Sequence, residues 1–157
     1  MSDTPSIDAV RAATLVEPKK AKAFTLKGSD TRGEKLFESK KDAKASLEED
    51  ALAINDLQDA LFASKSGALL IVLQGIDTSG KDGVAKETFH YTSPLGVNVF
   101  AYGKPTEEEL AHDYLWRLHK QTPKRGYIHV FNRSQYEDVL VVKVRELAPA
   151  KQVEQRY

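Results

Sequence analysis

The stretch LLIVLQGIDTSGKDG, residues 69–83, determines how the rest of the chain is interpreted. It begins within an apolar run, ALLIVLQ (68–74), whose β-branched residues favour a strand that is apolar on both faces. Such a strand is expected at the centre of a parallel sheet. A glycine-rich turn follows, and a helix is predicted from about Lys81 to His90. The sequence therefore indicates a strand, a turn and a helix in immediate succession.

The turn itself has the spacing of a phosphate-binding loop, with Gly75 followed by Gly80 and Lys81. Glycines allow backbone N–H groups to face phosphate oxygens, and the start of the next helix adds partial positive charge. Lys81 would neutralise phosphate charge. The alternative is a turn that binds nothing, but the strand before it and the helix after it favour the phosphate loop. The expected phosphate-binding residues are Gly75, Thr78, Ser79, Gly80, Lys81, Asp82 and Gly83.

One position departs from the common motif, because Asp82 stands where a serine or threonine usually contacts Mg²⁺. A metal must then be held by another group. Asp77 is the candidate, since hard cations bind carboxylate oxygens. An aspartate in a loop also forms turns, so a purely structural role for Asp77 stays open.

The remaining pattern alternates helices and strands. Residues 1–42 show no sustained period and are expected to be an irregular arm, with residues 43–157 as the core domain. An amphipathic helix is predicted at 43–63, with its apolar face formed by Leu47, Ala51, Ile54, Leu57 and Leu61. Further strands are predicted at 97–102 and 127–131, and further helices at 106–120 and 134–146. This order predicts an α/β fold, a three-layer sandwich with a parallel sheet like that of P-loop kinases.

Composition excludes several classes of function. The chain has 23 acidic and 23 basic residues, so its net charge carries no information about a polyanionic partner, although residues 117–145 carry a local basic surplus. It has no cysteine, which excludes disulfides and thiolate chemistry and fits a cytoplasmic location. The longest apolar stretch, 68–73, is too short to span a membrane. The four histidines are scattered singly, without the spacing of a metal site.

Two motifs resemble the polyphosphate kinase 2 family. Residues 69–83 are similar to that family's Walker A region, and FNRSQYEDVLVVKV (131–144) is similar to its second motif. The segment between them, 103–126, and the arm sequence KAFTLKGSD (22–30) also resemble the family. The resemblance extends over about residues 15–157, and the two motifs at this separation are highly specific.

The resemblance implies roles for particular residues. Asp77 would hold Mg²⁺ and orient the acceptor phosphate, Lys81 would bind phosphates, and Arg133 would contact the transferring phosphoryl group. Asn132 with Glu137 would mark the class of members that accept AMP as well as ADP. The implied partners are inorganic polyphosphate, ADP or AMP, and ATP, with no nucleic acid and no membrane. The full-length form is expected to be a homo-oligomer.

Alternatives remain beside this interpretation. Arg133 could simply pair with Glu137 at i, i+4, and Tyr114, Trp116 and Tyr136 are expected to pack rather than to bind a nucleobase. The family has a helical lid after its second motif, and this sequence stops soon after that motif. The core is therefore expected to be incomplete at its C-terminus. An ATP-dependent nucleotide or small-molecule kinase and an inactive lidless fragment are the alternative functions.

Overall fold

A computed structural model describes residues 5–14, 19, 23, 25 and 35–156. The chain divides into two compact units, Met1–Glu49 and Asp50–Tyr157. In the first unit, helix α1 (Ile7–Thr14) lies within the segment that was expected to be irregular. Helix α3 (Lys40–Ser64) begins in the first unit and ends in the second. Half of the expected arm, including most of 22–30, lies outside the described residues.

The second unit is built on a parallel sheet of strands β1 (Leu69–Leu73), β2 (Val97–Ala101) and β3 (Ile128–Asn132). The strand order is β1-β3-β2, with Leu69 and Val97 both aligned with Ile128. The prediction that 68–74 forms a central strand was wrong, because β3 is central and β1 lies at an edge of this sheet in the described part of the chain. Leu69 and Val72 are accordingly 46% and 41% exposed. The apolar run predicted the strand, but it did not reveal the position of that strand in the sheet.

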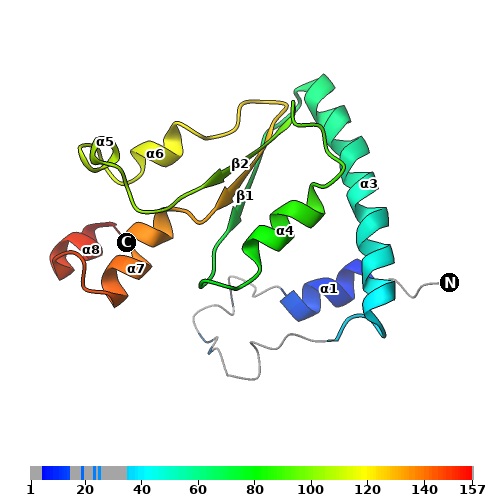
Figure 1. The fold of residues 1–157 in the computed structure, drawn as a ribbon, viewed down its shortest axis with the longest axis horizontal. Coiled ribbons are helices and arrows are strands. Elements are labelled where there is room, and N and C mark those ends of the chain that lie inside the picture. Colours follow the sequence, from blue (N-terminus) through cyan, green and yellow to red (C-terminus); the bar gives the residue numbers. More distant parts are fainter. Residues whose placement is uncertain (1–4, 15–18, 20–22, 24, 26–34, 157) are drawn as a thin grey trace. The chain divides into compact units, whose positions relative to one another are not determined.

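Helices connect the strands and cover the sheet. Strand β1 is followed by helix α4 (Lys81–Thr88). Strand β2 is followed by α5 (Glu107–Leu110) and α6 (Trp116–His119). Strand β3 is followed by the 3₁₀ helix η2 (Gln135–Asp138), α7 (Leu140–Val144) and α8 (Ala150–Arg156). Figure 1 shows α4 on one side of the sheet and α5 and α6 on the other. The expected α/β layering is therefore present.

Two predicted helices are each broken in two. The capping box at the start of α5 is formed as predicted: Glu109 N–H donates to Thr106 Oγ1 at 3.2 Å, and Thr106 N–H donates to Glu109 Oε2 at 2.8 Å. The helix does not reach residue 120, because Asp113 Oδ1 accepts from Leu115 N–H at 2.9 Å and starts a new turn. The helix predicted at 134–146 divides into η2 and α7, which flank Val139.

The apolar face predicted for α3 is only partly buried. Within the second unit Ala51 is 2% exposed, whereas Leu57 is 70% exposed. The most buried α3 side chain is instead Gln58, at 1% exposure, whose Oε1 accepts from Ser93 N–H at 3.1 Å. This hydrogen bond satisfies only the amide oxygen, because Gln58 Nε2 is buried without a hydrogen-bond partner among the described residues. In the first unit Leu47 is 38% exposed.

The core of the sheet is aromatic. Tyr102, Leu118 and Phe131 form its buried cluster, with Phe100 and Leu115 packed against them. Tyr102 and Phe131 meet edge to face with ring centroids 5.0 Å apart. Among the described residues, no helix has the length and apolar character needed to cross a membrane.

Candidate functional site

The loop between β1 and α4 has a constrained backbone. Gly80, directly before α4, has φ of 92°, in the left-handed region that glycine tolerates. Thr78 has φ of 67°, which is costly for a β-branched residue. A Cβ added to Gly75 would lie 2.6 Å from Ser79 Oγ, so the loop also needs a glycine at its first position. Strain of this kind is found where a loop is shaped for binding.

Lys81 is folded over its own loop. Its ammonium group donates to the carbonyl oxygens of Gly75 at 3.0 Å and Ile76 at 2.8 Å, and to Ser79 Oγ at 3.3 Å. The backbone N–H groups of Asp82 and Gly83, in the first turn of α4, have no acceptor within the described part of the chain. The loop therefore presents free amides and an ammonium group held by weak neutral partners, a combination suited to a phosphate group.

Arg133 lies directly after β3 and faces this loop. Its backbone N–H donates to Leu73 O at 2.9 Å, and its φ of 73° is again in the left-handed region. Its Nη1 donates to Glu137 Oε2 at 3.1 Å, and its Nη2 donates to the Asp77 carboxylate. The carboxylate of Glu137, and to a smaller degree that of Asp77, raises the pKa of Arg133 above its ordinary value. Arg133 is thus a permanently charged group held between two acids.

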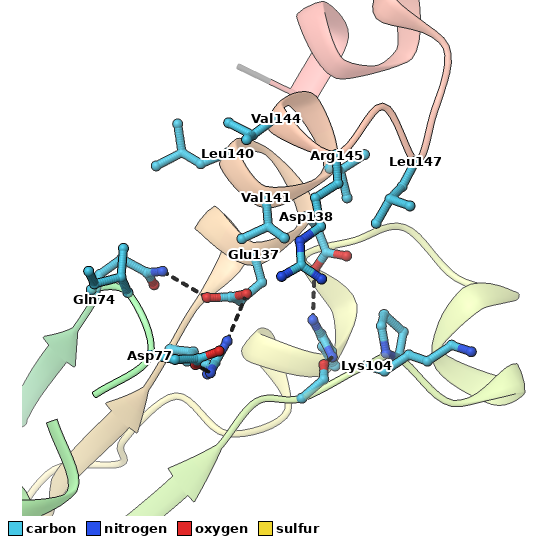
Figure 2. Close-up of a pocket in the computed structure, with 17 residues that line it drawn as sticks. Gln74, Asp77, Lys104, Glu137, Asp138, Leu140, Val141, Val144, Arg145 and Leu147 are labelled. Carbon is cyan, nitrogen blue, oxygen red and sulfur yellow. Dashed lines mark hydrogen bonds and ion pairs between the residues drawn. The ribbon is translucent and has the colours of Figure 1, made fainter. Parts of the chain in front are cut away.

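A cavity of about 790 Å³ opens beside these residues. Figure 2 shows Asp77, Glu137 and Asp138 on one side of it and the apolar side chains of Leu140, Val141 and Val144 on another. Its lining includes both acids and bases, and the basic side chains are Lys104, Arg117, Arg133 and Arg145. The cavity lies where the carboxyl ends of β1 and β3 meet, which is the usual place for ligands in open α/β sheets.

Asp82 and Asn132 face a different groove. Asn132 Nδ2 donates to the Asp82 carboxylate. Both residues line a second, smaller opening of about 440 Å³ between α4 and β2, together with Lys86 and Phe89. The two residues expected to determine the nucleotide class, Asn132 and Glu137, therefore lie at separate openings.

Comparison with known proteins decides the family. The sequence model described as "Polyphosphate kinase 2 (PPK2)" matches residues 37–157. The chain belongs to the polyphosphate kinase 2 family. Its parallel sheet and phosphate loop are the P-loop kinase fold of that family, since the chain superposes on the crystal structure of polyphosphate kinase 2 from Arthrobacter aurescens TC1 with a TM-score of 0.81 and 37% identity.

Relatives in the polyphosphate kinase 2 family extend further than this chain. The AMP/ADP-polyphosphate phosphotransferase of Meiothermus ruber is 45% identical over 139 residues, which cover 85% of this chain and 51% of the relative. The ADP-polyphosphate phosphotransferase of Rhodopseudomonas palustris is 41% identical over 114 residues, covering 73% of this chain and 39% of the relative. The Arthrobacter structure is matched over 94% of this chain and 52% of its own. The chain thus spans about half the length of these family members, or less.

Among the expected site residues, Asp77 and Arg133 are brought into contact, and Lys81 lies on the same loop as Asp77. Sequence reasoning missed Gln74 and Ser134, although both take part in hydrogen bonds at this site. The available signal was weak. Gln74 is a polar residue that ends an apolar run, and Ser134 lies within the second family motif.

Of the three aromatic residues expected to pack, Tyr114 and Trp116 make the contacts that follow, whereas Tyr136 is 42% exposed. Trp116 is stacked on the His112 ring at 3.9 Å, and Lys120 Nζ lies 4.1 Å from the Trp116 ring centroid. Tyr114 donates its hydroxyl hydrogen to Arg156 O at 2.7 Å. These contacts occupy the Trp116 ring, which is therefore no free surface for a nucleobase. Within the described ranges, no three histidine, aspartate or glutamate side chains gather as a metal cluster.

Proposed function

We propose that this chain forms the phosphate-loop part of a phosphotransferase that moves a phosphoryl group between inorganic polyphosphate and ADP or AMP. The observation that carries the proposal is the contact of Asp77 with Arg133, which joins the phosphate loop to the second family motif. The names of the Meiothermus and Rhodopseudomonas relatives support the same reaction. Asp77, Lys81 and Arg133 are the proposed catalytic residues.

The chemistry asks the protein to position groups and to neutralise charge. Phosphoryl transfer passes through a loose transition state whose charge lies on the equatorial oxygens. Lys81 would exchange its bonds to the Gly75 and Ile76 carbonyls for phosphate oxygens. Arg133 would exchange Asp77 for the transferring phosphoryl group while keeping Glu137. Both exchanges replace a contact within the loop by a contact with substrate, so the charges act where negative charge develops.

Mg²⁺ is the proposed cofactor, and Asp77 is the residue that would hold it. The Asp77 side chain is 76% exposed on the loop, and only its Oδ1 is bound by Arg133. Mg²⁺ in phosphate sites is usually bound by one or two carboxylates together with phosphates and water, so a single exposed carboxylate suits it. When bound, the ion would supply positive charge to the phosphate oxygens. Asp82 is the weaker candidate, because its carboxylate is bound by Asn132.

The proposal also concerns the choice of nucleotide, the oligomeric state and the cellular location. Glu137 lines the larger cavity beside Arg133, where a carboxylate would influence the charge that an acceptor phosphate can carry. Asn132 would act from the smaller groove. A homo-oligomeric full-length form is part of the same proposal. So is a cytoplasmic location, because ADP and ATP are abundant there.

The deciding experiment compares phosphate donors. The chain is incubated with ADP and Mg²⁺, with polyphosphate as the sole donor, and ATP is measured by luciferase. In parallel, AMP is supplied with ATP as donor and ADP formation is followed. The proposal expects transfer from polyphosphate. Transfer from ATP alone would instead identify an ATP-dependent nucleotide kinase. Binding of polyphosphate without any transfer would identify a phosphate-binding chain that has no activity of its own.

A further inference from the structure

Gln74 links the two halves of the site. It is the residue between β1 and the phosphate loop, and its side chain makes two hydrogen bonds to the segment after β3. Ser134 Oγ donates to Gln74 Oε1 at 3.1 Å, and Gln74 Nε2 donates to Glu137 Oε1 at 2.9 Å. Figure 2 shows the second of these bonds reaching Glu137 across the cavity wall.

The orientation of the Gln74 amide is fixed by Ser134. Ser134 is completely buried, and its Oγ accepts from Tyr136 N–H at 3.3 Å. Its single hydroxyl hydrogen is therefore directed at Gln74, which must present its oxygen to it. The Gln74 NH₂ group is left facing Glu137. A flipped amide would set a donor against Ser134 and an oxygen against the Glu137 carboxylate.

Glu137 in turn fixes Arg133. One carboxylate oxygen, Oε1, is bound by Gln74, which leaves Oε2 for Arg133 Nη1 at 3.1 Å. The second guanidinium nitrogen, Nη2, then points to Asp77. Glu137 is the more enclosed of the two acids, with a side chain 14% exposed against 76% for Asp77. Of the two partners of Arg133, Glu137 is thus the fixed one and Asp77 is the one that can be exchanged.

We propose that Gln74 is a positioning residue that holds Glu137 so that the Arg133 guanidinium stays aimed at the phosphate loop when substrate displaces Asp77. This inference rests on the proposed function. Without the Gln74 amide, Glu137 Oε1 would lose its only side-chain donor among the described residues, and the carboxylate could turn with Arg133 away from the loop. Placement errors of this kind reduce turnover more than ground-state binding.

The test replaces Gln74 by methionine, which keeps the length of the side chain and removes both hydrogen bonds. Gln135→Met is the matched control, because Gln135 lies on η2 next to the network and makes none of its bonds. In polyphosphate-dependent ATP formation, Gln74→Met should lower kcat by about tenfold, with KM for polyphosphate changed by less than about twofold. Gln135→Met should leave both unchanged.

Two further variants separate positioning from mere support of the fold. In a Glu137→Gln background the additional effect of Gln74→Met on kcat should vanish, since Gln74 acts through that carboxylate. The exchanged pair Gln74→Glu/Glu137→Gln keeps one amide–carboxylate hydrogen bond. Gln74→Met should also lower Tm, because it removes two hydrogen bonds, and the exchanged pair should restore that Tm. It should not restore kcat, because Arg133 then faces the amide at position 137 and no longer a carboxylate.

A readout that needs no activity is the guanidinium NMR spectrum of Arg133, assigned with an Arg133→Lys variant. Wild type should show separate Nη signals because the ion pairs slow rotation, and Gln74→Met should merge them. Unchanged kcat or unchanged Arg133 signals in Gln74→Met would overturn the proposal. So would a kcat loss that persists fully beside Glu137→Gln. A wild-type chain that binds polyphosphate without transfer would be the phosphate-binding chain without activity described above, and the Arg133 signals would then decide the role of Gln74 alone.

Discussion

Arg117 Nη2 donates to Asp138 Oδ2 at 2.7 Å inside the protein, where the two side chains are only 5% and 12% exposed. Arg117 Nη1 also donates to Gly103 O at 3.0 Å, and Arg156 donates to the backbone oxygen of Asp138 at 3.0 Å. The pair therefore ties the segment after β2 to η2, the short helix next to Arg133. Arg117 and Asp138 both line the cavity, so their ion pair stabilises one of its walls.

Breaking this pair on one side should be costly. Arg117→Met leaves the Asp138 carboxylate buried without its partner, and loss of one member of a buried pair costs about 3–5 kcal/mol. The double variant Arg117→Met/Asp138→Leu should recover part of that loss, because the more buried carboxylate is removed as well and only Glu109, whose side chain is 25% exposed, then lacks Arg117. Urea unfolding followed by the fluorescence of Trp116, the single tryptophan, measures the free energy of unfolding. A loss below about 1 kcal/mol for Arg117→Met would contradict a buried, structural pair.

Lys81→Ala should abolish polyphosphate-dependent transfer while the fold survives. Among the described residues the ammonium contacts only its own loop, so its removal should leave the core unchanged. Loss of such a charge contact at the phosphates costs about 3 kcal/mol or more in barrier. Lys44→Ala is the control, since Lys44 is an exposed lysine on α3 that lines neither opening. Activity of Lys81→Ala within about twofold of wild type would refute the phosphate-loop assignment.

Asp77→Asn and Asp82→Asn should differ in a defined order. Asp77→Asn should lower kcat and raise the Mg²⁺ concentration needed for half-maximal rate, because its exposed carboxylate is the proposed metal ligand. Asp82→Asn should change both much less, since Asp82 lies in the first turn of α4 and its carboxylate accepts a hydrogen bond from Asn132. Magnesium titrations of the initial rate compare the two. The reverse order would assign the metal to Asp82.

The sequence predicted the parts of this site that lie in one short segment better than the contacts between residues far apart along the chain. The phosphate loop is a local motif, so Gly75, Gly80 and Lys81 could be recognised directly. The contact between Asp77 and Arg133 joins residues 56 positions apart and was not predicted, since the family resemblance implied only a separate role for each residue. Gln74 and Arg117 could not be predicted, because a polar residue in an apolar segment looks the same whether its partner is protein or water. The break after α5 depended on one Asp113 hydrogen bond that no periodicity reveals.

Gly96→Ala should destabilise the protein although the substitution is small. An added Cβ would lie 2.0 Å from Gln58 Nε2 and 2.9 Å from Gln58 Cδ, and Gln58 is 1% exposed with its oxygen bound by Ser93 N–H. Overpacking of this kind costs about 1–3 kcal/mol. Gly67→Ala is the control, because a Cβ there meets nothing within 4 Å. Gln58→Ala in the Gly96→Ala background should relieve the clash, and an additive loss in urea unfolding would argue against it.

Tyr102 should make the protein sensitive to alkaline pH. Burial raises the pKa of Tyr102 to about 12; the charge of Arg117 lowers this pKa and that of Glu109 raises it. The buried Tyr102 hydroxyl has no hydrogen-bond partner among the described residues. In the unfolded chain a tyrosine has its ordinary pKa of 10.0, so between pH 10 and 12 the unfolded state loses a proton that the folded state keeps. The stability associated with Tyr102 is therefore complete below pH 10 and is lost as pH rises toward 12, by at most about 1.4 kcal/mol per pH unit.

Tyr102→Phe should remove this dependence. Below pH 10 the variant should be as stable as wild type or slightly more stable, because it deletes a buried hydroxyl that lacks a partner. Above pH 10 its advantage over wild type should grow, while lysines and the other tyrosines titrate equally in both proteins and cancel in the difference. Urea unfolding of the two proteins from neutral pH to pH 12 gives this difference directly. A constant difference across that range, or a neutral-pH loss above about 1 kcal/mol in Tyr102→Phe, would show that the hydroxyl is solvated or hydrogen-bonded in solution.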